Sequence, residues 1–324
     1  MEPNAATDLR PGPTNSSPRA ETAQQRATAS IARTILGTKI GGRLPNVDDL
    51  RSTIGVGAGT VQKALQDLQS SGWAVLDSKP RQGTALVSRQ SGELWRTAGL
   101  PTLTALLPLP NSWEFQGLAT GLRAELDRLG IPSTLLYGHG SEQRAAAVEN
   151  GIAHFALMSL GAADSLTASH SGVVTQIVLP AGTYYAPDSV LVIAKAPRHE
   201  LGEDLRIGVD PFSIDHALLS KAEFPGYRYV DVSYAQVPSA LTLGIIDAAV
   251  WHRTALGLSL DDRGLVTWPL ENSEARALSS GIDAGAIISR ADDAATQSVL
   301  AEIDTERVLA LQRDVVAGDV LPLY

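Results

Sequence analysis

Cysteine is absent from the 324-residue sequence, and aromatic side chains make up only 5% of it. A chain without cysteine has no disulfide, no thiolate ligand for a metal and no cysteine nucleophile, so enzyme classes that depend on these groups are excluded. The six histidines lack the HExxH spacing or any comparable spacing of metal ligands. We therefore expect no metal site.

Motifs of common catalytic and cofactor sites are absent as well. The sequence has no G-x-S-x-G nucleophile turn, no G-x-x-x-x-G-K-[ST] phosphate loop and no G-x-G-x-x-G that opens a helix after a strand. We therefore expect no catalytic residue and no cofactor.

Long apolar runs are also missing. No run approaches the roughly 20 apolar residues that a membrane-spanning helix needs. The first residues lack the basic segment and apolar stretch of a secretory signal. We expect a cytoplasmic protein that has no membrane partner.

Negative charge dominates the sequence, but it is unevenly distributed. The formal net charge is −9. Residues 1–90 hold 11 Lys and Arg against 7 Asp and Glu, a net charge of +4, whereas residues 91–324 hold 15 against 28, a net charge of −13. Only the front of the chain is attracted to phosphates, and the acidic remainder is expected to lie away from a DNA duplex. This division fits a DNA-reading domain that carries a separate sensing domain.

Residues 41–87 hold the pattern around which the sequence is organised. Asn46 followed by Asp49 is typical of a helix cap, and Val47, Leu50 and Ile54 then recur at helical spacing until Gly55. A second helix is predicted over residues 58–71. Its apolar face holds Val61, Ala64, Leu65 and Leu68, and its polar face holds Thr60, Gln62, Lys63 and Gln66. A short helix, a turn with glycine and a second helix form the helix-turn-helix plan.

Two short strands are predicted after the second helix. The runs WAVLD and TALVS are joined by SKPRQG, which carries two positive charges and ends on a turn glycine. This hairpin is interpreted as a wing. The alternative is a helical hairpin and a strand pair that serve only for packing.

These residues resemble the winged-helix domain of GntR-type bacterial transcription regulators, whose pattern runs from G-x-x-LP through GTV-x-x-AL to G-T-x-x-V. The resemblance implies binding to double-stranded operator DNA. That family places Ser-Arg before its Thr-Val pair and Arg after it, where this chain has Gly57, Ala58 and Gln62, so the usual operator sequence is not implied. The residues expected to contact DNA are Arg43, Thr60, Gln62, Lys63, Lys79, Arg81, Gln82 and Gly83.

The chain on either side of this segment divides by composition. Residues 1–21 are rich in Pro, Ser, Thr, Ala and Asn without apolar periodicity, which predicts a disordered tail. A helix over residues 22–36 is expected to complete a winged-helix domain at residues 22–88. The polar run of residues 89–92 is interpreted as a short linker, and residues 93–324 as the sensing domain.

From residue 95 onward, apolar strands alternate with amphipathic helices, which indicates sheets flanked by helices. One unit has strands at 102–109, 132–137 and 152–158 and helices at 112–129 and 142–150. The next has strands at 205–209, 227–232 and 245–250 and helices at 214–222 and 236–243. The apolar stretch at 174–194 and strands at 265–270 and 284–289 imply that the chain crosses between two lobes and returns.

Two such lobes resemble the type 2 periplasmic-binding-protein fold over residues 94–293. More narrowly, the runs LWRTAGL, PLPNS, GLATGL, RIGVDPFSIDHALL and IDAAVWH resemble the YhfZ-type regulators, in which such a domain follows a GntR-like head. The resemblance implies a multidomain fold, with a winged helix-turn-helix N-terminal domain plus a two-lobed α/β periplasmic-binding-protein-like domain. The helical pattern of residues 294–324 is expected to pack on the first lobe or on a second subunit.

Candidate ligand-binding residues lie at predicted helix starts. Ligands of open α/β sheets lie beyond the carboxyl ends of the strands, where helix starts present unpaired backbone N–H groups. Small polar residues suited to a carboxylate or phosphate occur at three such starts, namely Asn111 with Ser112, Ser159, and Asp210 with Ser213. A small, anionic effector is therefore expected, with helix capping as the alternative role of each residue.

Six further side chains are candidates, three of them weaker. Trp113, Tyr184 and Tyr185 can stack on a flat or amphipathic ligand, or they can belong to the core. Asp215 and Trp251 are ranked last. Asp247 is ranked last with them, because it can simply cap a helix or pair with a local arginine.

These features favour a ligand-responsive transcription regulator that binds DNA as a homodimer, because one winged helix covers too little surface for specific affinity. The alternative is a cytoplasmic enzyme of the two-lobed fold, against which stands the lack of a recognisable acid, base or nucleophile set. A solute receptor for transport is disfavoured by the DNA-binding head.

Overall fold

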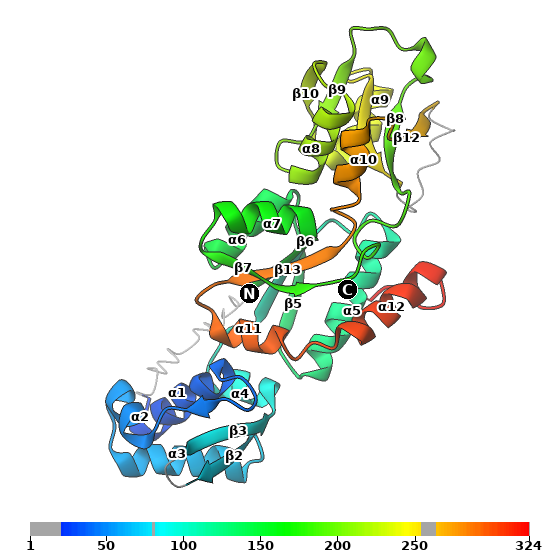
Figure 1. Cartoon of the computed structure of the whole chain (residues 1–324). Helices are drawn as coiled ribbons and strands as arrows, with labels where there is room; N and C mark the ends of the chain where they lie inside the picture. Colours follow the sequence, from blue (N-terminus) through cyan, green and yellow to red (C-terminus); the bar gives the residue numbers. More distant parts are fainter. Residues whose placement is uncertain (1–20, 80–81, 254–263, 324) are drawn as a thin grey trace, which may run out of the picture.

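The computed structural model of the chain describes residues 21–79, 82–253 and 264–323. Figure 1 shows three units in a row, which we call the head, lobe one and lobe two. The tail predicted at residues 1–21 lies, except for Glu21, outside the described residues. None of the helices in these described ranges is long and apolar enough to cross a membrane.

The head is a winged helix. Its elements are α1 (Ala23–Gly37), β1 (Arg43–Leu44), α2 (Val47–Ile54), α3 (Ala58–Ser70), β2 (Ala74–Lys79) and β3 (Gly83–Arg89). The strands form an antiparallel sheet in the order β1-β3-β2. The Asn46 side chain caps α2 by accepting a hydrogen bond of 2.9 Å from the Asp49 N–H, and Gly55 ends this helix with a φ of 73°. The predicted helix-turn-helix and wing are confirmed.

Lobe one is built on a five-stranded sheet in the order β5-β4-β6-β13-β7. Its elements are β4 (Leu103–Leu107), α5 (Trp113–Arg128), β5 (Ser133–Tyr137), α6 (Ser141–Glu149), β6 (Phe155–Ser159), α7 (Leu160–Ser169), β7 (Val173–Val178) and β13 (Gly285–Arg290). Strand β4 is parallel to β5 and β6, whereas β13 is antiparallel to β6 and β7. Strand β6 is buried along its whole length, as expected of a central strand covered on both faces.

Lobe two repeats this arrangement in the order β10-β9-β11-β8-β12. Its elements are β8 (Val190–Ala194), η1 (Arg198–Glu200), β9 (Arg206–Val209), α8 (Ile214–Glu223), β10 (Arg228–Asp231), η2 (Tyr234–Gln236), α9 (Val237–Thr242), β11 (Ala248–His252), β12 (Val266–Pro269) and α10 (Ser273–Ser279). The chain enters this lobe between β7 and β8 and returns to β13 after α10, so two crossings join the lobes (Figure 1). The fold class expected from the sequence is confirmed.

The C-terminal helices α11 (Ala294–Leu300) and α12 (Thr305–Ala317) belong to lobe one. Helix α12 lies along α5, where two glycines permit close approach. A Cβ atom at Gly117 would lie 2.8 Å from the Cα of Gln312, and one at Gly121 would lie 2.7 Å from the carbonyl oxygen of Val308. The sequence predicted that this segment packs either on the first lobe or on a second subunit. In the structure it packs on lobe one.

Residues 89–92, predicted to be a linker, instead form a buried joint between the head and lobe one. Strand β3 ends at Arg89, and α4 (Ser91–Thr97) follows at once. The Arg89 guanidinium donates to three carbonyl oxygens at the end of α1 and to that of Ser298, and it pairs with Glu302. The linker prediction was wrong because polar composition does not reveal partners that come from remote segments.

Candidate functional site

The side chains expected to read DNA lie on α3 of the head. Gln62 and Lys63 are exposed, and Thr60 is half-buried. The Lys63 ammonium lies 3.5 Å from the Asp67 carboxylate, but both side chains are largely exposed, so the pair is weak and the ammonium remains available to a phosphate. Helix α3 begins without a side-chain cap, which leaves its first N–H groups open.

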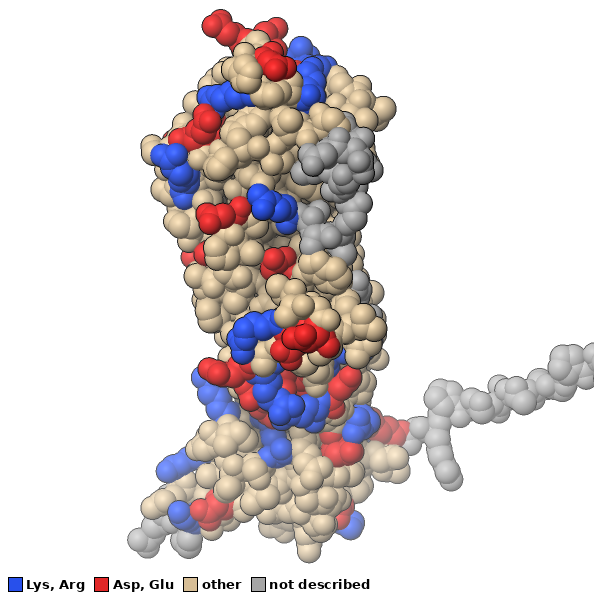
Figure 2. Space-filling view, turned by 90° about the vertical axis from the view of Figure 1, so that its right-hand side faces the viewer, with Lys and Arg blue, Asp and Glu red and all other residues tan. Residues whose placement is uncertain are grey.

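The wing and β1 supply the other residues expected at DNA. Lys79 and Gln82 are exposed on either side of the wing tip, Gly83 has a φ of 81°, and Arg43 is exposed on β1. Arg81 lies outside the described residues. On the face shown in Figure 2, the head carries Lys and Arg interspersed with acidic side chains instead of one continuous basic patch.

A cavity of about 50 Å³ lies between the two lobes. Its walls include Asn111, Phe115 and Arg144 from lobe one, Tyr184 and Tyr185 from the first crossing, and Ser213 and Tyr234 from lobe two. The lobes touch at its rim, where the Ser141 hydroxyl accepts a hydrogen bond of 3.3 Å from the Ile214 N–H. His139 Nε2 also lies 2.7 Å from a carboxylate oxygen of Asp210. The cleft is therefore nearly closed.

A second cavity of about 10 Å³ adjoins the first on the lobe two side. Tyr185 and Tyr234 line both cavities. The other polar side chains around the second cavity are those of Asp215, His216, Trp251 and His252. The two cavities together bring polar groups of both lobes to one place.

The helix starts singled out from the sequence differ in what their side chains do. Ser112 and Ser159 are buried and act as helix caps, since their hydroxyls accept the N–H groups of Phe115 at 3.2 Å and Ala162 at 3.1 Å. Ser213 precedes α8 without a capping bond from its side chain and lines the first cavity. Its hydroxyl is therefore the one of the three that is best placed to meet a ligand.

Asp210 and Asn111 also differ in whether their side-chain oxygens are free to bind a ligand. The fully buried carboxylate of Asp210 accepts the N–H groups of Phe212 at 2.9 Å and Tyr234 at 2.8 Å, besides its contact with His139. Protein groups thus occupy this carboxylate. Asn111 lines the first cavity, and its side-chain oxygen has no hydrogen-bond partner within the described part of the chain.

Aromatic rings form a cluster at the floor of the cleft. The ring centroid of Tyr184 lies 4.7 Å from that of Phe115 and 4.8 Å from that of Tyr185. The ring centroids of Tyr185 and His252 are 5.2 Å apart. Burial raises the pKa of Tyr184 to about 12. Tyr184 and Tyr185 therefore pack together and also face the cavity, whereas Trp113 is half-buried and lines neither cavity.

Asp215 and Asp247, the two carboxylates ranked last, have pKa values that are shifted in opposite directions. Burial raises the pKa of Asp215 to about 6, although the nearby Ser159 hydroxyl and the Arg144 charge oppose this rise. Hydrogen bonds from Arg206 and Lys195 hold the pKa of Asp247 well below its usual range. For Asp247 the structure shows the pairing alternative, since Arg206 Nη2 donates to it at 2.9 Å.

Several residues of the cleft were missed from the sequence, among them Arg144, Tyr234 and His252. Burial lowers the pKa of His252 to about 3, so the ring is neutral at pH 7. The Tyr234 hydroxyl accepts the backbone N–H of His252 at 2.7 Å and contacts Nδ1 of its ring. Donation from this hydroxyl to Nδ1 places the ring proton on Nε2, which has no partner among the residues described. Nothing in the helix pattern around Arg144 distinguishes it from a solvent-facing residue.

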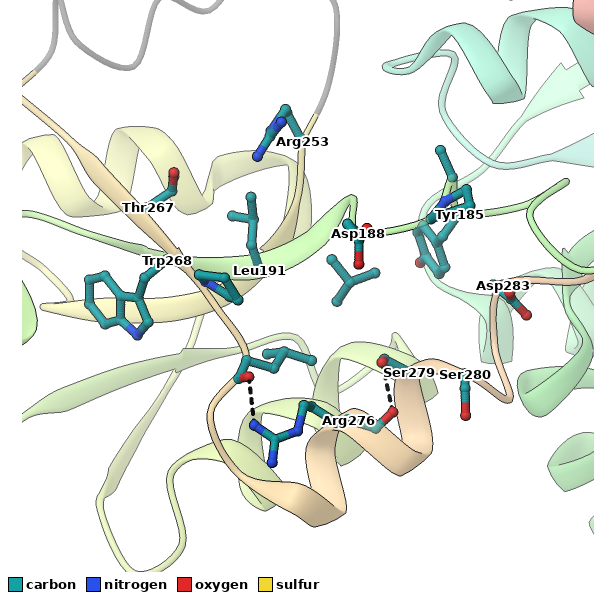
Figure 3. Close-up of a pocket in the computed structure, with 15 residues that line it drawn as sticks. Tyr185, Asp188, Leu191, Arg253, Thr267, Trp268, Arg276, Ser279, Ser280 and Asp283 are labelled. Atoms are coloured by element: carbon teal, nitrogen blue, oxygen red, sulfur yellow. Dashed lines mark hydrogen bonds between the residues drawn. The ribbon is translucent and has the colours of Figure 1, made fainter.

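A larger cavity of about 550 Å³ shares Tyr185 with the two smaller ones. Figure 3 shows that its labelled walls come from the two crossings, β8, β12, α10 and the end of β11, with Trp268 at one end and Tyr185 at the other. Arg253 and Arg276 contribute positive charge, and Asp188 and Asp283 contribute negative charge. Because the charges alternate around it, this cavity favours no single class of ligand.

The cleft gathers side chains that can bind a small molecule. Within residues 21–79, 82–253 and 264–323, no three His, Asp or Glu side chains are grouped so that they could hold a metal ion. The cleft instead combines a buried cation, a buried carboxyl group, hydroxyl groups and aromatic faces. Such a set can orient a small polar molecule.

Comparisons with known proteins agree with this architecture. A family model for the YhfZ C-terminal domain matches residues 90–324, and one for a helix-turn-helix domain matches residues 39–86. The chain is similar to the uncharacterized protein YhfZ of Escherichia coli (strain K12), with 30% identity over 298 residues that cover 91% of this chain and 95% of that protein. It is also similar to the crystal structure of YhfZ from Shigella flexneri, with 26% identity and a TM-score of 0.57 over 72% of this chain and 98% of that one. The chain therefore belongs to the YhfZ family.

Proposed function

We propose that the chain is a cytoplasmic transcription regulator that binds operator DNA through its head and, between its lobes, a small metabolite that carries at least one anionic group. The observation that carries this proposal is a cavity with walls from both lobes in a chain with a helix-turn-helix head. A ligand that touches both lobes favours the closed arrangement by its differential affinity for it. Closure of the two lobes is then the change that alters DNA binding by the head.

The preference for an anion rests on the walls of the cavity. Arg144 is buried and supplies a fixed positive charge, and Ser213 and Asn111 supply hydrogen-bonding groups beside it. A guanidinium matches the geometry of a carboxylate or phosphate. The anionic group of the ligand therefore faces lobe one.

The signal passes through a homodimer. Two heads related by a two-fold axis read two half-sites in adjacent major grooves, which gives the surface that one head lacks. The head shares its apolar core with lobe one, so ligand closure moves lobe two relative to both. A dimer contact that includes lobe two converts this movement into a new spacing between the heads.

Genomic footprinting of the full chain tests DNA binding. Replacing Thr60 and Gln62 by alanine is expected to weaken sequence preference, whereas replacing Lys79 and Arg81 by alanine lowers affinity for all sequences and flattens the salt dependence. Arg290→Gln, which removes an exposed ion pair in lobe one, is the control. If no site is enriched, or if the wing double variant binds like the parent, the head is not a DNA-binding module.

A thermal-shift screen of metabolites, followed by operator binding with each hit, tests the sensor. Ser213→Tyr is expected to fill the cavity and abolish the response while basal DNA binding and folding persist. Hits that stabilise this variant as well as the parent, or that leave operator affinity unchanged, contradict the proposal. Conversion of a hit into product during incubation would favour the enzyme alternative.

A further inference from the structure

The cleft contains a buried cation that lacks a counter-ion. Arg144 on α6 is 4% exposed, and its guanidinium donates to the carbonyl oxygens of Leu157 at 3.1 Å and Gly138 at 2.9 Å and to the Tyr184 hydroxyl at 3.3 Å. All three acceptors are neutral, and Arg144 forms no ion pair with any described carboxylate. An unpaired buried charge is costly, so this arrangement favours a negative group in the cavity.

The opposite lobe contributes a buried carboxyl group that also forms no ion pair with any described side chain, although the Ser159 hydroxyl lowers its pKa by hydrogen bonding. Asp215 in the first turn of α8 is 6% exposed, and its Oδ1 atom has no hydrogen-bond partner in the described part of the chain. Its pKa is raised to about 6 by burial, so the group is mainly ionised at pH 7. The attraction of Arg144 acts on it from a distance, since the two side chains form no ion pair. Asp215 therefore favours a positive group.

The two charges line adjoining cavities of different size. Arg144 lines the cavity of about 50 Å³, Asp215 lines the one of about 10 Å³, and the rings of Tyr185 and Tyr234 border both. A water-sized group needs about 10 to 15 Å³ of such space. The Arg144 side thus accommodates a carboxylate with a few further atoms, and the Asp215 side accommodates about one group of ammonium size.

We propose that the cleft binds a small α-amino acid as a zwitterion, with its carboxylate toward Arg144 and its ammonium toward Asp215. This inference rests on the proposed function and narrows its ligand. A simple anion would neutralise Arg144 but would place like charge near Asp215, whereas a zwitterion satisfies both. The aromatic faces of Tyr185 and Tyr234 suit the ammonium group as well. The cavity size limits the side chain to that of glycine, alanine or serine in the closed arrangement.

Isothermal titration calorimetry of the full chain with matched probes tests this proposal. The probes are glycine, serine and both enantiomers of alanine, with lactate as the analogue that lacks the amine and alaninamide as the analogue that lacks the carboxylate. At pH 7.5 we expect at least one amino acid to bind, and to bind at least tenfold more tightly than either analogue of alanine. Asp215→Asn conserves shape and removes a buried charge, so it is expected to fold and to lose the preference for alanine over lactate.

Asp188→Asn provides the control, because Asp188 is an exposed carboxylate of the larger cavity and lines neither small one. It is expected to bind the amino acids as the parent does. The zwitterion proposal is overturned if none of these amino acids binds, if lactate binds as tightly as alanine, or if Asp215→Asn retains the preference. In that case another anion that changes operator affinity would still support the proposed function. Amino-acid binding without any change in operator affinity would instead support the site and contradict the regulator.

Discussion

The joint between the head and lobe one differs in kind from the joint between lobe one and lobe two. At the first, one buried apolar cluster continues from α1 through α4 into α5, and the side chain of Arg89 is only 2% exposed. At the second, two chain crossings, a few polar contacts and the rings of Phe115, Tyr185 and His252 surround small cavities. Separating apolar surface from apolar surface is costly, whereas polar contacts exchange with water at little net cost. We therefore expect the first joint to be rigid and movement to occur at the second.

This difference indicates which unit responds to conditions. Lobe two contains the buried ionisable groups Asp215, His216 and His252, whereas the sequence of the head contains no histidine. Protonation is therefore expected to act mainly on lobe two. Three changes test this contrast.

The largest effect is expected from Arg89→Met, which breaks the rigid joint. The substitution removes the hydrogen bonds to the end of α1 and leaves the mostly buried Glu302 without its partner. Loss of one member of a buried pair costs about 3 kcal/mol or more of unfolding free energy. Urea unfolding followed by circular dichroism measures the loss, and operator affinity is expected to fall with it.

Arg290→Gln is the matched control for this experiment. It also removes an arginine that pairs with a carboxylate, but both side chains of that pair are exposed. Its expected cost is below about 1 kcal/mol. Equal stability of the two variants would mean that the head is not fixed to lobe one through Arg89.

The second prediction concerns acid. Burial lowers the pKa of His216 to about 4, so the folded chain keeps this ring neutral at a pH where the unfolded chain, with a pKa near 6.5, binds a proton. Stability from this group is present above pH 6.5 and is lost as pH falls toward 4, by about 2 kcal/mol at pH 5. His252 acts in the same direction, whereas the raised pKa of Asp215 opposes it in part. The unfolding free energy is therefore expected to fall between pH 7 and pH 5.

Two histidine variants locate this acid sensitivity. His216→Gln removes the titrating group but keeps one donor and one acceptor for the Asp210 N–H and the Val250 carbonyl oxygen, and it is expected to flatten the pH dependence. His199→Gln changes a histidine whose side chain is 81% exposed and is expected to leave the profile unchanged. Identical profiles for both variants would show that the acid sensitivity does not arise at His216.

The sequence predicted local elements well because their causes are local. The capping pair Asn46 and Asp49 and the glycine at position 55 fixed the bounds of α2 without reference to other segments. The repeated pattern of strands and helices similarly predicted both sheets. A strand that is buried on both faces has a continuous apolar sequence, whatever its position in the sheet. Fold class followed from these patterns.

The joints and the cleft depend on remote contacts, and the sequence predicted them poorly. Arg89 looked like part of a polar linker, because its partners Ser298 and Glu302 lie more than 200 residues away. Arg144 and Asp215 come from different lobes, and only the closed arrangement brings them to adjoining cavities. Conversely, Ser112 and Ser159 had the right residue type and place, but capping bonds occupy their hydroxyls.

The smallest effect is expected from His139→Asn, which weakens the contact between His139 in lobe one and Asp210 in lobe two. Asp210 keeps its two backbone hydrogen bonds, so the unfolding free energy is expected to change by less than about 1 kcal/mol. The closed arrangement nevertheless loses one contact between the lobes, and small-angle X-ray scattering should show a larger radius of gyration. His170→Asn is the control, because His170 has similar exposure and its partner Glu149, at 2.9 Å, lies within lobe one. Equal scattering from both variants would mean that the His139 contact does not hold the lobes together.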